Sequence, residues 1–270
     1  MEQTAKQFKN IFGDSVVEHH SNVEFEQETT KSRLACENWD APVIVTTNVQ
    51  FFESLYAART SRARKVHNII NSVVILDEAQ LVPPDFLNPI LSVIKELNSH
   101  YGVSFVLCTA TQPAWNKRKG FDWEFPGLSG IKEIVQNPHS LYQQLKRVKV
   151  ELPDDFNIGQ DWDSVAQELA KHESALCIVN TRKDCRALFK LMPEGTYHLS
   201  ALMCAEHRSK VIKEIQDRLH NQDPIRVIST QLVEAGVDLD FPVVYRAVAG
   251  LDSIAQAAGR CNREGKLPSG

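Results

Sequence analysis

The stretch Val73-Val74-Ile75-Leu76-Asp77-Glu78-Ala79-Gln80 decides the fold that we expect for this chain. Its four apolar residues are followed directly by two carboxylates. A short apolar run is typical of a strand buried on both faces of a parallel sheet, and ligands of such sheets bind where the strands end. Because Mg²⁺ prefers carboxylate oxygens, we expect Asp77 to hold the ion and Glu78 to orient and polarise an attacking water. The alternative is an ordinary acidic turn after a strand.

Similar apolar runs recur along the chain and alternate with stretches of helical apolar spacing. The runs cover residues 42–46, 72–76, 104–108, 175–179, 225–229 and 243–248. We expect the first four to be buried on both faces of a sheet. The helical stretches include 84–98 and 163–172, the second with Asp163 as its N-cap. Strand–helix alternation predicts an α/β fold with doubly wound parallel sheets.

Residues 113–155 interrupt this alternation. The segment holds Trp115, a Lys117-Arg118-Lys119 run and several glycines and prolines. We interpret it as a surface excursion that ends a first domain and leads into a second. The expected domains are therefore residues 1–150 and 151–270.

Composition and charge exclude several classes of protein. The chain is 43% hydrophobic and 24% charged, which is typical of a globular protein, and its net charge of −4 is unlike that of a protein that holds nucleic acid by overall charge. No apolar run approaches the roughly 18 residues of a membrane span, so no membrane partner is expected. The six cysteines are scattered without a CxxC pair, which favours a reducing, cytoplasmic location. His19 and His20 are adjacent and do not predict a metal site.

Hydroxyl and amide side chains follow several of the predicted strands. Thr46 and Thr47 end the first run, Asn180 follows the fourth, and Thr230 follows the fifth. Such groups suit the phosphates of a nucleic-acid strand. Thr46, Thr47 and Asn180 are equally suited to cap a helix, and the alternative for Thr230 is an ordinary strand–turn–strand. A local cation cluster comprises Arg59, Arg62, Arg64 and Lys65. We expect Arg62 to contact nucleic acid, and the alternative is a solvated helix face.

Three further motifs carry candidate site residues. Thr109-Ala110-Thr111 follows a strand, and its two hydroxyls are suited to hydrogen bonds that link one functional site of the protein to another. The alternative is an ordinary turn after a strand. In the segment from Ser229 to Asp238, Gly236 and Asp238 follow a predicted strand. The Asp238 carboxylate is suited to bind a ribose hydroxyl or to form an ion pair with an arginine. The alternative is an ordinary strand–turn–strand.

The segment Gln256-Ala257-Ala258-Gly259-Arg260-Cys261-Asn262-Arg263 is the least degenerate motif. Arg260 and Arg263 are suited to stabilise charge that develops on a γ-phosphate, because guanidinium stays charged and binds oxygens bidentately. We assign Gln256 to the same site. The alternative is a basic helix end that interacts with its own carbonyls.

In their order along the chain, these strings resemble the helicase portion of the CRISPR-associated effector helicase–nuclease of type I systems, a superfamily 2 helicase. The strings that carry the resemblance are Val17–Ser21, Thr60–Arg62, Ser72–Gln80, Cys108–Gln112, Ser229–Phe241 and Ser253–Arg263. The resemblance implies two RecA-like parallel-sheet domains and the cofactors ATP and Mg²⁺. It also implies the motor core of a DNA helicase or translocase of CRISPR antiviral defence, which acts on single-stranded DNA with a guide-RNA surveillance complex.

Two departures from that family pattern qualify the expectation. No G-x-x-x-x-G-K-[ST] phosphate loop occurs in the sequence, and no His-Asp nuclease precedes the helicase motifs. We therefore expect a first domain that is truncated at its N-terminal side and a chain that is inactive alone. A separate segment carrying the phosphate loop and nuclease is the partner that this implies. The alternatives are a generic superfamily 2 helicase or a non-catalytic nucleic-acid-binding remnant.

Overall fold

The computed structural model describes residues 2–20, 30–109, 115–119, 124–234 and 236–267. The chain divides into two compact units, Met1–Lys132 and Glu133–Gly270. Their border falls inside the segment 113–155 that interrupts the sequence pattern, whereas domain limits at 150 and 151 stay a prediction. Within the described ranges, no helix is long and apolar enough to cross a bilayer.

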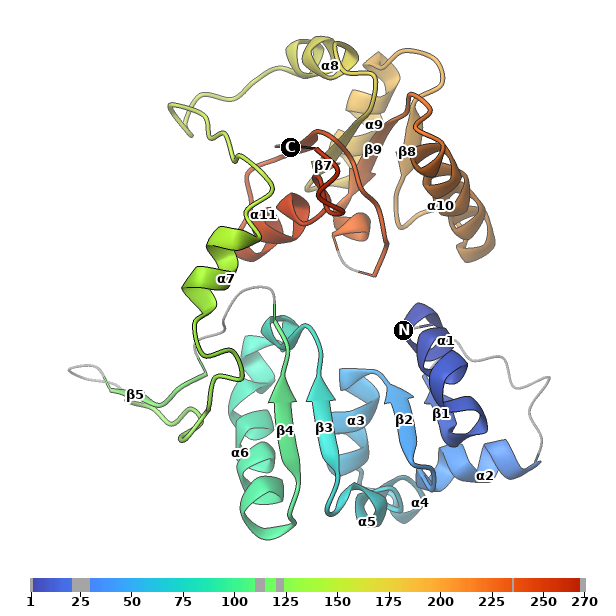
Figure 1. Cartoon of the computed structure of the whole chain (residues 1–270), viewed down its shortest axis with the longest axis vertical. Coiled ribbons are helices and arrows are strands. Elements are labelled where there is room, and N and C mark those ends of the chain that lie inside the picture. The colour runs from blue at the N-terminus through green and yellow to red at the C-terminus, as the bar shows by residue number, and fades with distance from the viewer. Residues whose placement is uncertain (1, 21–29, 110–114, 120–123, 235, 268–270) are drawn as a thin grey trace. The chain divides into compact units, whose positions relative to one another are not determined.

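The parallel part of the first unit is built from four short strands with helices between them (Figure 1). The strands are β1 (Val16–His19), β2 (Val43–Thr46), β3 (Val73–Leu76) and β4 (Ser104–Leu107). The helices are α1 (Glu2–Phe12), α2 (Thr30–Asn38), α3 (Asn48–Leu55), α4 (Thr60–Ala63), α5 (Val66–Ile69) and α6 (Pro84–His100), with short 3-10 turns η1 (Gly13–Ser15) and η3 (Ala79–Leu81).

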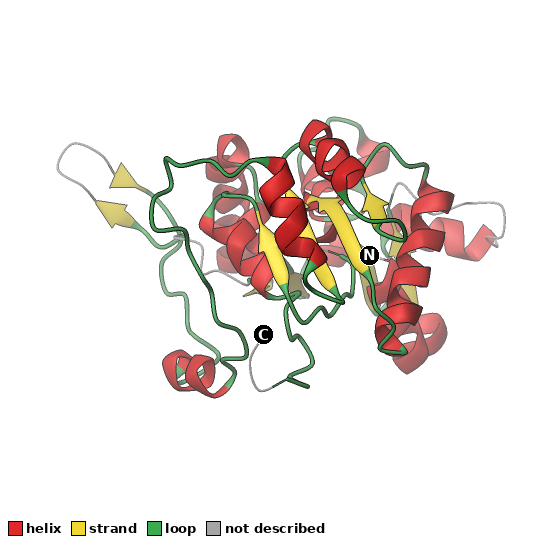
Figure 2. Ribbon diagram, turned by 90° about the horizontal axis from the view of Figure 1, so that it is seen from above, coloured by secondary structure: helices red, strands yellow, loops and turns green. Residues whose placement is uncertain are grey.

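Two parallel strand pairs make up this layer. Val16 lies opposite Val43 in the pair β1–β2, and Val73 lies opposite Ser104 in the pair β3–β4. The arrows of β2, β3 and β4 point the same way in Figure 1, and β1 runs parallel to β2, so the four strands end on the same side of the layer. An antiparallel pair, β5 (Arg118–Lys119) and β6 (Glu124–Phe125), stands apart from the helices in Figures 1 and 2.

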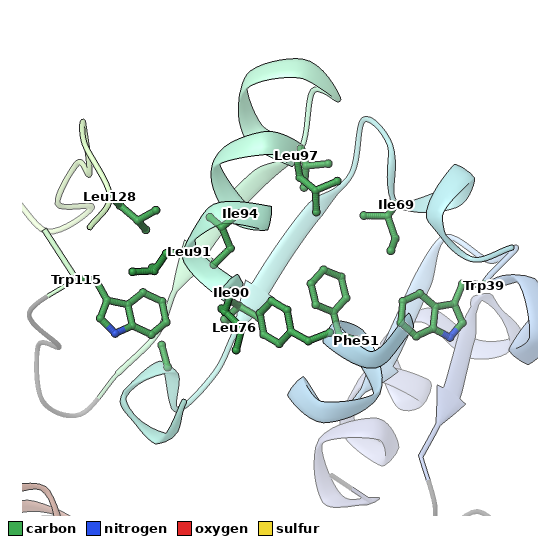
Figure 3. Packing of buried hydrophobic residues seen from close by; sticks show 13 residues of the cluster. Trp39, Phe51, Ile69, Leu76, Ile90, Leu91, Ile94, Leu97, Trp115 and Leu128 are labelled. Carbon is green, nitrogen blue, oxygen red and sulfur yellow. The ribbon is translucent and has the colours of Figure 1, made fainter. Parts of the chain in front are cut away.

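One hydrophobic core holds the first unit together (Figure 3). Helix α6 starts with Pro84, a residue suited to the first helical turn because its missing N–H would be unpaired there anyway. Ile90, Leu91, Ile94 and Leu97 recur at helical spacing and form its buried face. They pack in one cluster with Leu76 of β3 and Phe51 of α3.

Part of the segment that the sequence assigns to a surface excursion belongs to this core. Trp115 and Leu128 are 5% and 8% exposed and pack in the same cluster as α6. The Leu128 N–H donates to the Trp115 carbonyl at 2.6 Å. The prediction is therefore wrong for these two residues, whose large apolar surfaces are removed from water by α6.

One face of β3 is open to solvent. Leu76 is 2% exposed, but Val73 and Ile75 are 65% and 59% exposed. Alternate residues of a strand point to opposite faces, so helix α6 covers only one of them. The prediction that this strand is buried on both faces is wrong, because no described element covers the second face.

The second unit is a four-stranded parallel sheet in the order β10-β7-β9-β8. Its strands are β7 (Ala175–Val179), β8 (Tyr197–Leu199), β9 (Arg226–Thr230) and β10 (Val244–Arg246). Its helices are α7 (Pro138–Gln144), α8 (Trp162–Ala170), α9 (Arg182–Leu191), α10 (Ala205–His220) and α11 (Leu251–Ala258), with a 3-10 turn η4 (Gln231–Val233).

The central strand β7 is buried on both faces, as the sequence predicts. Leu176 and Ile178 belong to one core cluster, which includes Ile215 of α10. Cys177 and Val179 belong to a second cluster, which includes residues of α8 and α9. Because alternate residues enter different clusters, helices cover each face of the sheet.

The predicted runs and helical stretches each coincide with an element to within a few residues, but one cap was misplaced and several elements were not predicted. Helix α8 is capped by Asp161, whose carboxylate accepts the Ser164 N–H at 2.7 Å, and not by Asp163 as predicted. Asp163 lies inside the first turn, where a negative charge still favours the helix. Strands β1 and β8 have four and three residues and interrupt their apolar runs with His or Glu, so the pattern missed them.

Candidate functional site

The two carboxylates lie directly after β3, in a turn held by the neighbouring strand. The Cys108 N–H donates to the Leu76 carbonyl at 2.9 Å, and the Ala79 N–H donates to the Cys108 carbonyl at 3.0 Å. Asp77 is exposed, and its Oδ1 accepts the Glu78 N–H at 3.0 Å. Mg²⁺ typically takes one or two protein carboxylates and completes its shell with water and phosphate oxygens. An exposed Asp77 fits that role, although no group of three or more metal-ligating side chains exists in the described ranges.

Glu78 has an unusual backbone conformation that another side chain supports. Its φ of 51° and ψ of 44° place it in the left-handed region, which costs a non-glycine residue about 1–3 kcal/mol. Gln80 Nε2 donates to Glu78 Oε2 at 2.5 Å, which fixes the carboxylate. The Gln80 Oε1 atom is buried and has no hydrogen-bond partner among the described residues. Such an acceptor calls for a donor, for example a water molecule.

The hydroxyls after β2 already have partners inside the protein. Thr46 Oγ1 donates to the His19 carbonyl at 2.7 Å, so its proton is committed. Thr47 Oγ1 accepts the Gln50 N–H at 3.0 Å and caps α3, which leaves its own proton to donate. Asn48 Nδ2 donates to the Asp77 carbonyl at 3.3 Å. The segment after β2 therefore lies beside the carboxylate turn, and Thr47 is better suited than Thr46 to meet a phosphate.

The cation cluster divides into exposed and buried members. Arg59, Arg62 and Arg64 are exposed, whereas Lys65 is only 5% exposed. The Lys65 ammonium lies 5.4 Å from the centroid of the Trp39 ring, and burial lowers the pKa of this lysine. Arg62 is thus open to a ligand, as both interpretations of the sequence require.

The two adjacent histidines are engaged in hydrogen bonds within the first unit. His19 Nδ1 accepts from Trp39 Nε1 at 2.9 Å. Burial and the Lys65 charge lower the pKa of His19 to about 4. His20 Nε2 lies 2.8 Å from Glu18 Oε1, and Glu18 also pairs with Lys9. These contacts give both rings a structural role.

Thr109 lies two residues beyond the end of β4 and is partly buried. The turn that holds Asp77 and Glu78 is bonded to Cys108, the residue before it. Thr111 lies outside the described residues. The coupling role of Thr109 and Thr111 stays a prediction.

In the second unit, Asn180 follows β7 and uses both ends of its amide. Its Nδ2 donates to the Val248 carbonyl at 2.8 Å, and its Oδ1 accepts from Arg246 Nη1 at 2.6 Å. The next residue, Thr181, caps α9 by accepting the Asp184 N–H at 3.1 Å. Asn180 is therefore held in place, and its contact with nucleic acid stays a prediction.

Thr230, Gly236 and Asp238 frame the turn after β9. Thr230 is 8% exposed, and its carbonyl accepts the Ser229 hydroxyl at 2.8 Å. Gly236 has a φ of 73° and open space where a Cβ would stand, so a side chain there meets backbone strain but no neighbour. Asp238 Oδ1 pairs with Arg263 Nη1 at 2.9 Å. This ion pair is one of the two partners that the sequence left open for Asp238.

The two arginines of the last motif differ sharply. Arg260 is 9% exposed, with Nε donating to the Val233 carbonyl at 2.9 Å and Nη2 to the Glu234 carbonyl at 2.6 Å. Arg263 is about half exposed, and its pairing with Asp238 leaves several N–H donors for a ligand. Arg260 therefore ties the helix end to the turn after β9, while Arg263 is the arginine open to a phosphate. Gln256 is a partly buried residue of α11, one turn before Arg260.

A buried ion pair that the sequence did not single out joins these motifs. The side chains of Glu234 and Arg246 are 7% and 6% exposed, and Arg246 Nε lies 2.6 Å from Glu234 Oε1. The two atoms are close enough for an ion pair, but the Arg246 N–H does not point at the oxygen in the way that a regular hydrogen bond requires. Neither atom has a hydrogen-bond partner among the described residues. Through Asn180 Oδ1, Arg246 also reaches the end of β7. The only sequence signal was an arginine that interrupts an apolar run.

Sequence reasoning missed several other residues that position the site. Asp240 accepts the N–H groups of Arg263 and Glu264, and Asn262 holds the chain around that turn through its bonds to Arg147 and Leu267. Gln80 fixes Glu78 in the first unit. The contacts of Asp240 and of Asn262 with Arg147 depend on tertiary placement, whereas the contact of Gln80 is local. Short polar residues around a motif are too common to reveal such roles beforehand.

Two family models match the chain. Residues 1–119 match the DEAD/DEAH box helicase model, and residues 171–266 match the C-terminal model of the CRISPR-associated nuclease/helicase Cas3. The CRISPR-associated nuclease/helicase Cas3 of Haloferax volcanii is 25% identical over 88% of this chain and 35% of its own length. The chain spans 24% to 36% of the length of the curated relatives that it matches.

Solved structures give the same fold. The T. fusca Cas3-ATP structure matches with a TM-score of 0.65 and 17% identity, over 99% of this chain and 38% of that chain. A chain of the pre-nicking CRISPR RNA-guided surveillance complex matches with a TM-score of 0.60 and 16% identity, over 99% of this chain and 40% of its own length. Both units thus have the RecA-like parallel-sheet fold of helicases. Over its two units the chain therefore resembles the helicase region of CRISPR-associated nuclease/helicases.

Proposed function

We propose that this chain is the motor core of an ATP-dependent DNA helicase or translocase of CRISPR antiviral defence. The observation that carries the proposal is the Asp77-Glu78 pair, placed at the end of a parallel strand by a turn bonded to the neighbouring strand. Parallel sheets bind nucleotides at that position. The likeness to the DEAD/DEAH box helicase model and to the Cas3 model favours a helicase over other nucleotide-binding proteins.

In this proposal, Asp77 holds Mg²⁺, and the ion supplies charge stabilisation to the phosphates of bound ATP. Glu78 accepts a proton from the attacking water. Its left-handed backbone and its bond from Gln80 fix where that carboxylate points. Hydrolysis then joins the water oxygen to the γ-phosphorus and releases ADP and phosphate.

The second unit contributes positively charged arginines and the turn after β9 that carries Gly236 and Asp238. Arg263 stabilises charge on the γ-phosphate, because it is exposed and keeps donors beyond its pair with Asp238. Arg260 and Gln256 complete the same site. Arg260 acts through the backbone of the Gly236 and Asp238 turn, since its guanidinium is bonded to carbonyls there.

Single-stranded DNA is the substrate that we propose for Thr46, Thr47, Arg62, Asn180 and Thr230. Hydroxyls and a few cations, rather than overall charge, would make these contacts. Because one structural relative is a chain of a CRISPR RNA-guided surveillance complex, we propose such a complex as partner. Scattered thiols, all six of them free, fit the reducing cytoplasm as the place of action.

A second candidate is a non-catalytic DNA-binding role. It is favoured by one specific observation, the absence of a G-x-x-x-x-G-K-[ST] sequence from the chain. That loop supplies the backbone N–H donors and the lysine that grip the β- and γ-phosphates. The Cas3 family model weighs against a generic helicase of another family.

The test uses a complete helicase that carries this sequence together with a phosphate loop. Glu78→Gln keeps the shape of the side chain but cannot accept a proton, so ATP turnover should fall by about 10²-fold or more while ATP binding is retained. Arg263→Ala should likewise reduce turnover more than binding. Full turnover in both variants would show that the site is assigned to the wrong residues.

A further inference from the structure

The backbone around Arg263 is held by side chains from two other parts of the second unit. The approach to this residue is fixed in the core, because the Phe241 N–H donates to the Arg260 carbonyl at 2.9 Å and the Asn262 N–H donates to the Phe241 carbonyl at 2.9 Å. Phe241 is fully buried in a core cluster of this unit. Beyond Asn262 the chain leaves this pairing, and Arg263 is exposed. An exposed residue after a paired segment keeps one orientation only if other groups hold its peptide.

Asp240 holds the N–H side of Arg263. Its Oδ1 accepts the Arg263 N–H at 2.6 Å, and its Oδ2 accepts the Glu264 N–H at 3.3 Å. Hydrogen bonds to an ionised carboxylate are shorter than neutral ones and about twice as strong. Asp240 is only partly exposed and precedes buried Phe241. Two successive N–H groups therefore point at one fixed carboxylate, which sets the direction of the peptide between them.

Arg147 follows α7 and holds the carbonyl side of Arg263. Its Nη1 donates to the Arg263 carbonyl at 2.5 Å. Its own carbonyl accepts from Asn262 Nδ2 at 3.0 Å, and Asn262 is 2% exposed. Gly265 has a φ of 67°, and a Cβ there would lie 3.2 Å from Arg147 Nε, so the glycine leaves room for this guanidinium. Residues 116 positions apart in the chain thus meet at the carbonyl of Arg263.

These contacts let the Arg263 side chain act from a fixed backbone. Its guanidinium pairs with exposed Asp238 at 2.9 Å, and the pair uses only part of a group that has several N–H donors. An arginine side chain has much rotamer freedom, and a held backbone narrows the positions that its guanidinium can reach. A group placed before the reaction loses less freedom in the transition state, which is where the charge of such an arginine counts most.

We propose that Asp240 and Arg147 are positioning residues for Arg263, and that they place its guanidinium for the charge that develops on the γ-phosphate. The inference rests on the proposed function, which gives Arg263 that role and gives Asp240 and Arg147 none. Neither residue touches the nucleotide in this scheme, because each acts through its bond to the backbone of Arg263. The competing explanation is that both residues only stabilise the fold, in which case their effect on turnover would not depend on Arg263.

The test is a double-mutant cycle in a complete helicase that carries this sequence together with a phosphate loop. Asp240→Ala, Arg263→Ala and the two changes combined are compared by their kcat and KM for ATP. Asp240→Ala should lower kcat by about tenfold or more at a nearly unchanged KM, because a displaced arginine loses its contact in the transition state. In the Arg263→Ala background the same change should lower kcat by less than about twofold, because the effects of residues that act as one unit are not additive.

Further variants give the control and the rescue. Glu264→Ala removes a carboxylate from the same turn, one that pairs with Lys266, and keeps the Glu264 N–H, so its kcat should equal that of the wild type. Asp240→Asn keeps one acceptor oxygen for the Arg263 N–H and should lose less than Asp240→Ala. Arg147→Ala should lower kcat in the same way, and Arg147→Lys, which can still donate, should restore part of the loss. Thermal unfolding by circular dichroism shows that each variant is folded.

An equal fold loss from Asp240→Ala with and without Arg263 would overturn the inference, as would full turnover in Asp240→Ala. A loss in Asp240→Asn as large as in Asp240→Ala would overturn it too, because the charge and not the bond to the backbone would then matter. If Asp240→Ala does not fold, Arg147→Ala takes its place in the cycle, since Arg147 is exposed. Full turnover in Arg263→Ala would contradict the proposed function together with this inference, so the two failures are distinguishable.

Discussion

Strands β3 and β7 have the same sequence character but different surroundings. Both are short, continuously apolar and parallel to their neighbours. Every residue of β7 is at most 3% exposed, and strands pair with it on both sides. In β3, alternate side chains are 65% and 59% exposed, and β4 is its one partner among the described residues. An apolar run thus predicts a parallel strand, but not how many layers cover it.

The polar residues that follow the two strands also differ in how firmly other side chains hold them. Beyond β7, Asn180 is bonded to Arg246, which is paired in turn with buried Glu234. Beyond β3, Asp77 is exposed and its carboxylate is bonded only by the next N–H among the described residues. The second unit therefore fixes its strand end with its own side chains, whereas the first unit leaves a carboxylate open to a ligand.

The largest effect should come from breaking the buried ion pair. Arg246→Ala leaves Glu234 charged and unpaired in the interior, so we expect a loss of about 3–5 kcal/mol in the unfolding free energy of the second unit. Asp77→Ala, at the open strand end, should change stability by less than about 0.5 kcal/mol. Urea denaturation, followed by hydrogen exchange of peptides from each unit, measures both. Equal losses of unfolding free energy in the two variants would mean that the end of β7 is held no more tightly than the end of β3.

Matched substitutions within the strands compare their burial directly. Ile178→Ala removes a side chain that is fully buried in β7 and should cost about 2–5 kcal/mol. Ile75→Ala removes a side chain that is 59% exposed in β3 and should cost less than about 1 kcal/mol. The same urea experiment provides the values. A loss of similar size at Ile75 would show that its face is covered in solution.

How far the sequence predicts the structure follows from this comparison. Alternating apolar runs and helical spacing predicted the α/β fold, and the run at 175–179 coincides with β7. The position of Asp77 and Glu78 at a strand end was equally predictable, because it depends on adjacent residues. The open face of β3 was not, since it depends on elements far away in the chain.

The site shows the same division between local and tertiary information. The sequence drew attention to Arg260 and Arg263 together, as suited to one chemical role. Only the fold turns Arg260 inward onto the Val233 and Glu234 carbonyls and leaves Arg263 outside. Likewise, Thr47 was equally suited to a phosphate or a helix cap, and the structure shows the cap.

A smaller effect should come from acid, through His19 in the first unit. The pKa of His19 in the folded protein is lowered to about 4 from its ordinary 6.5. Between these values the unfolded chain binds a proton that the folded chain does not, so stability falls as the pH falls from 6.5 to 4 and is unaffected by this group above 6.5. Because the ring is only half buried, we expect a loss on the order of 1–2 kcal/mol.

His19→Gln keeps an acceptor for Trp39 but cannot titrate, so it should flatten this pH dependence. The measurement is urea denaturation at several pH values, with the pKa of His19 obtained by NMR titration. A His19 pKa near 6.5 would contradict a half-buried, neutral ring beside Lys65.

A small effect on stability should also come from changes on the open face of β3. Val73→Thr with Ile75→Thr keeps two β-branched side chains but makes that face more polar, so the unfolding free energy should change by about 1 kcal/mol or less. Binding of a hydrophobic dye and self-association should both fall, because an exposed apolar patch is removed. Unchanged dye binding would mean that the patch is not accessible.

The most direct test of the motor assignment is ATP turnover by the chain, measured with and without single-stranded DNA. A second set of reactions receives a separate polypeptide that carries a G-x-x-x-x-G-K-[ST] phosphate loop. We predict negligible ATP turnover by the chain alone, because no such loop occurs in its sequence. After the separate polypeptide is added, we predict turnover that DNA stimulates and that the Glu78→Gln variant lacks. DNA-stimulated hydrolysis by the chain alone, abolished by Glu78→Gln, would contradict the expectation that a phosphate loop is needed. Turnover that is indifferent to Glu78→Gln would contradict the assignment itself.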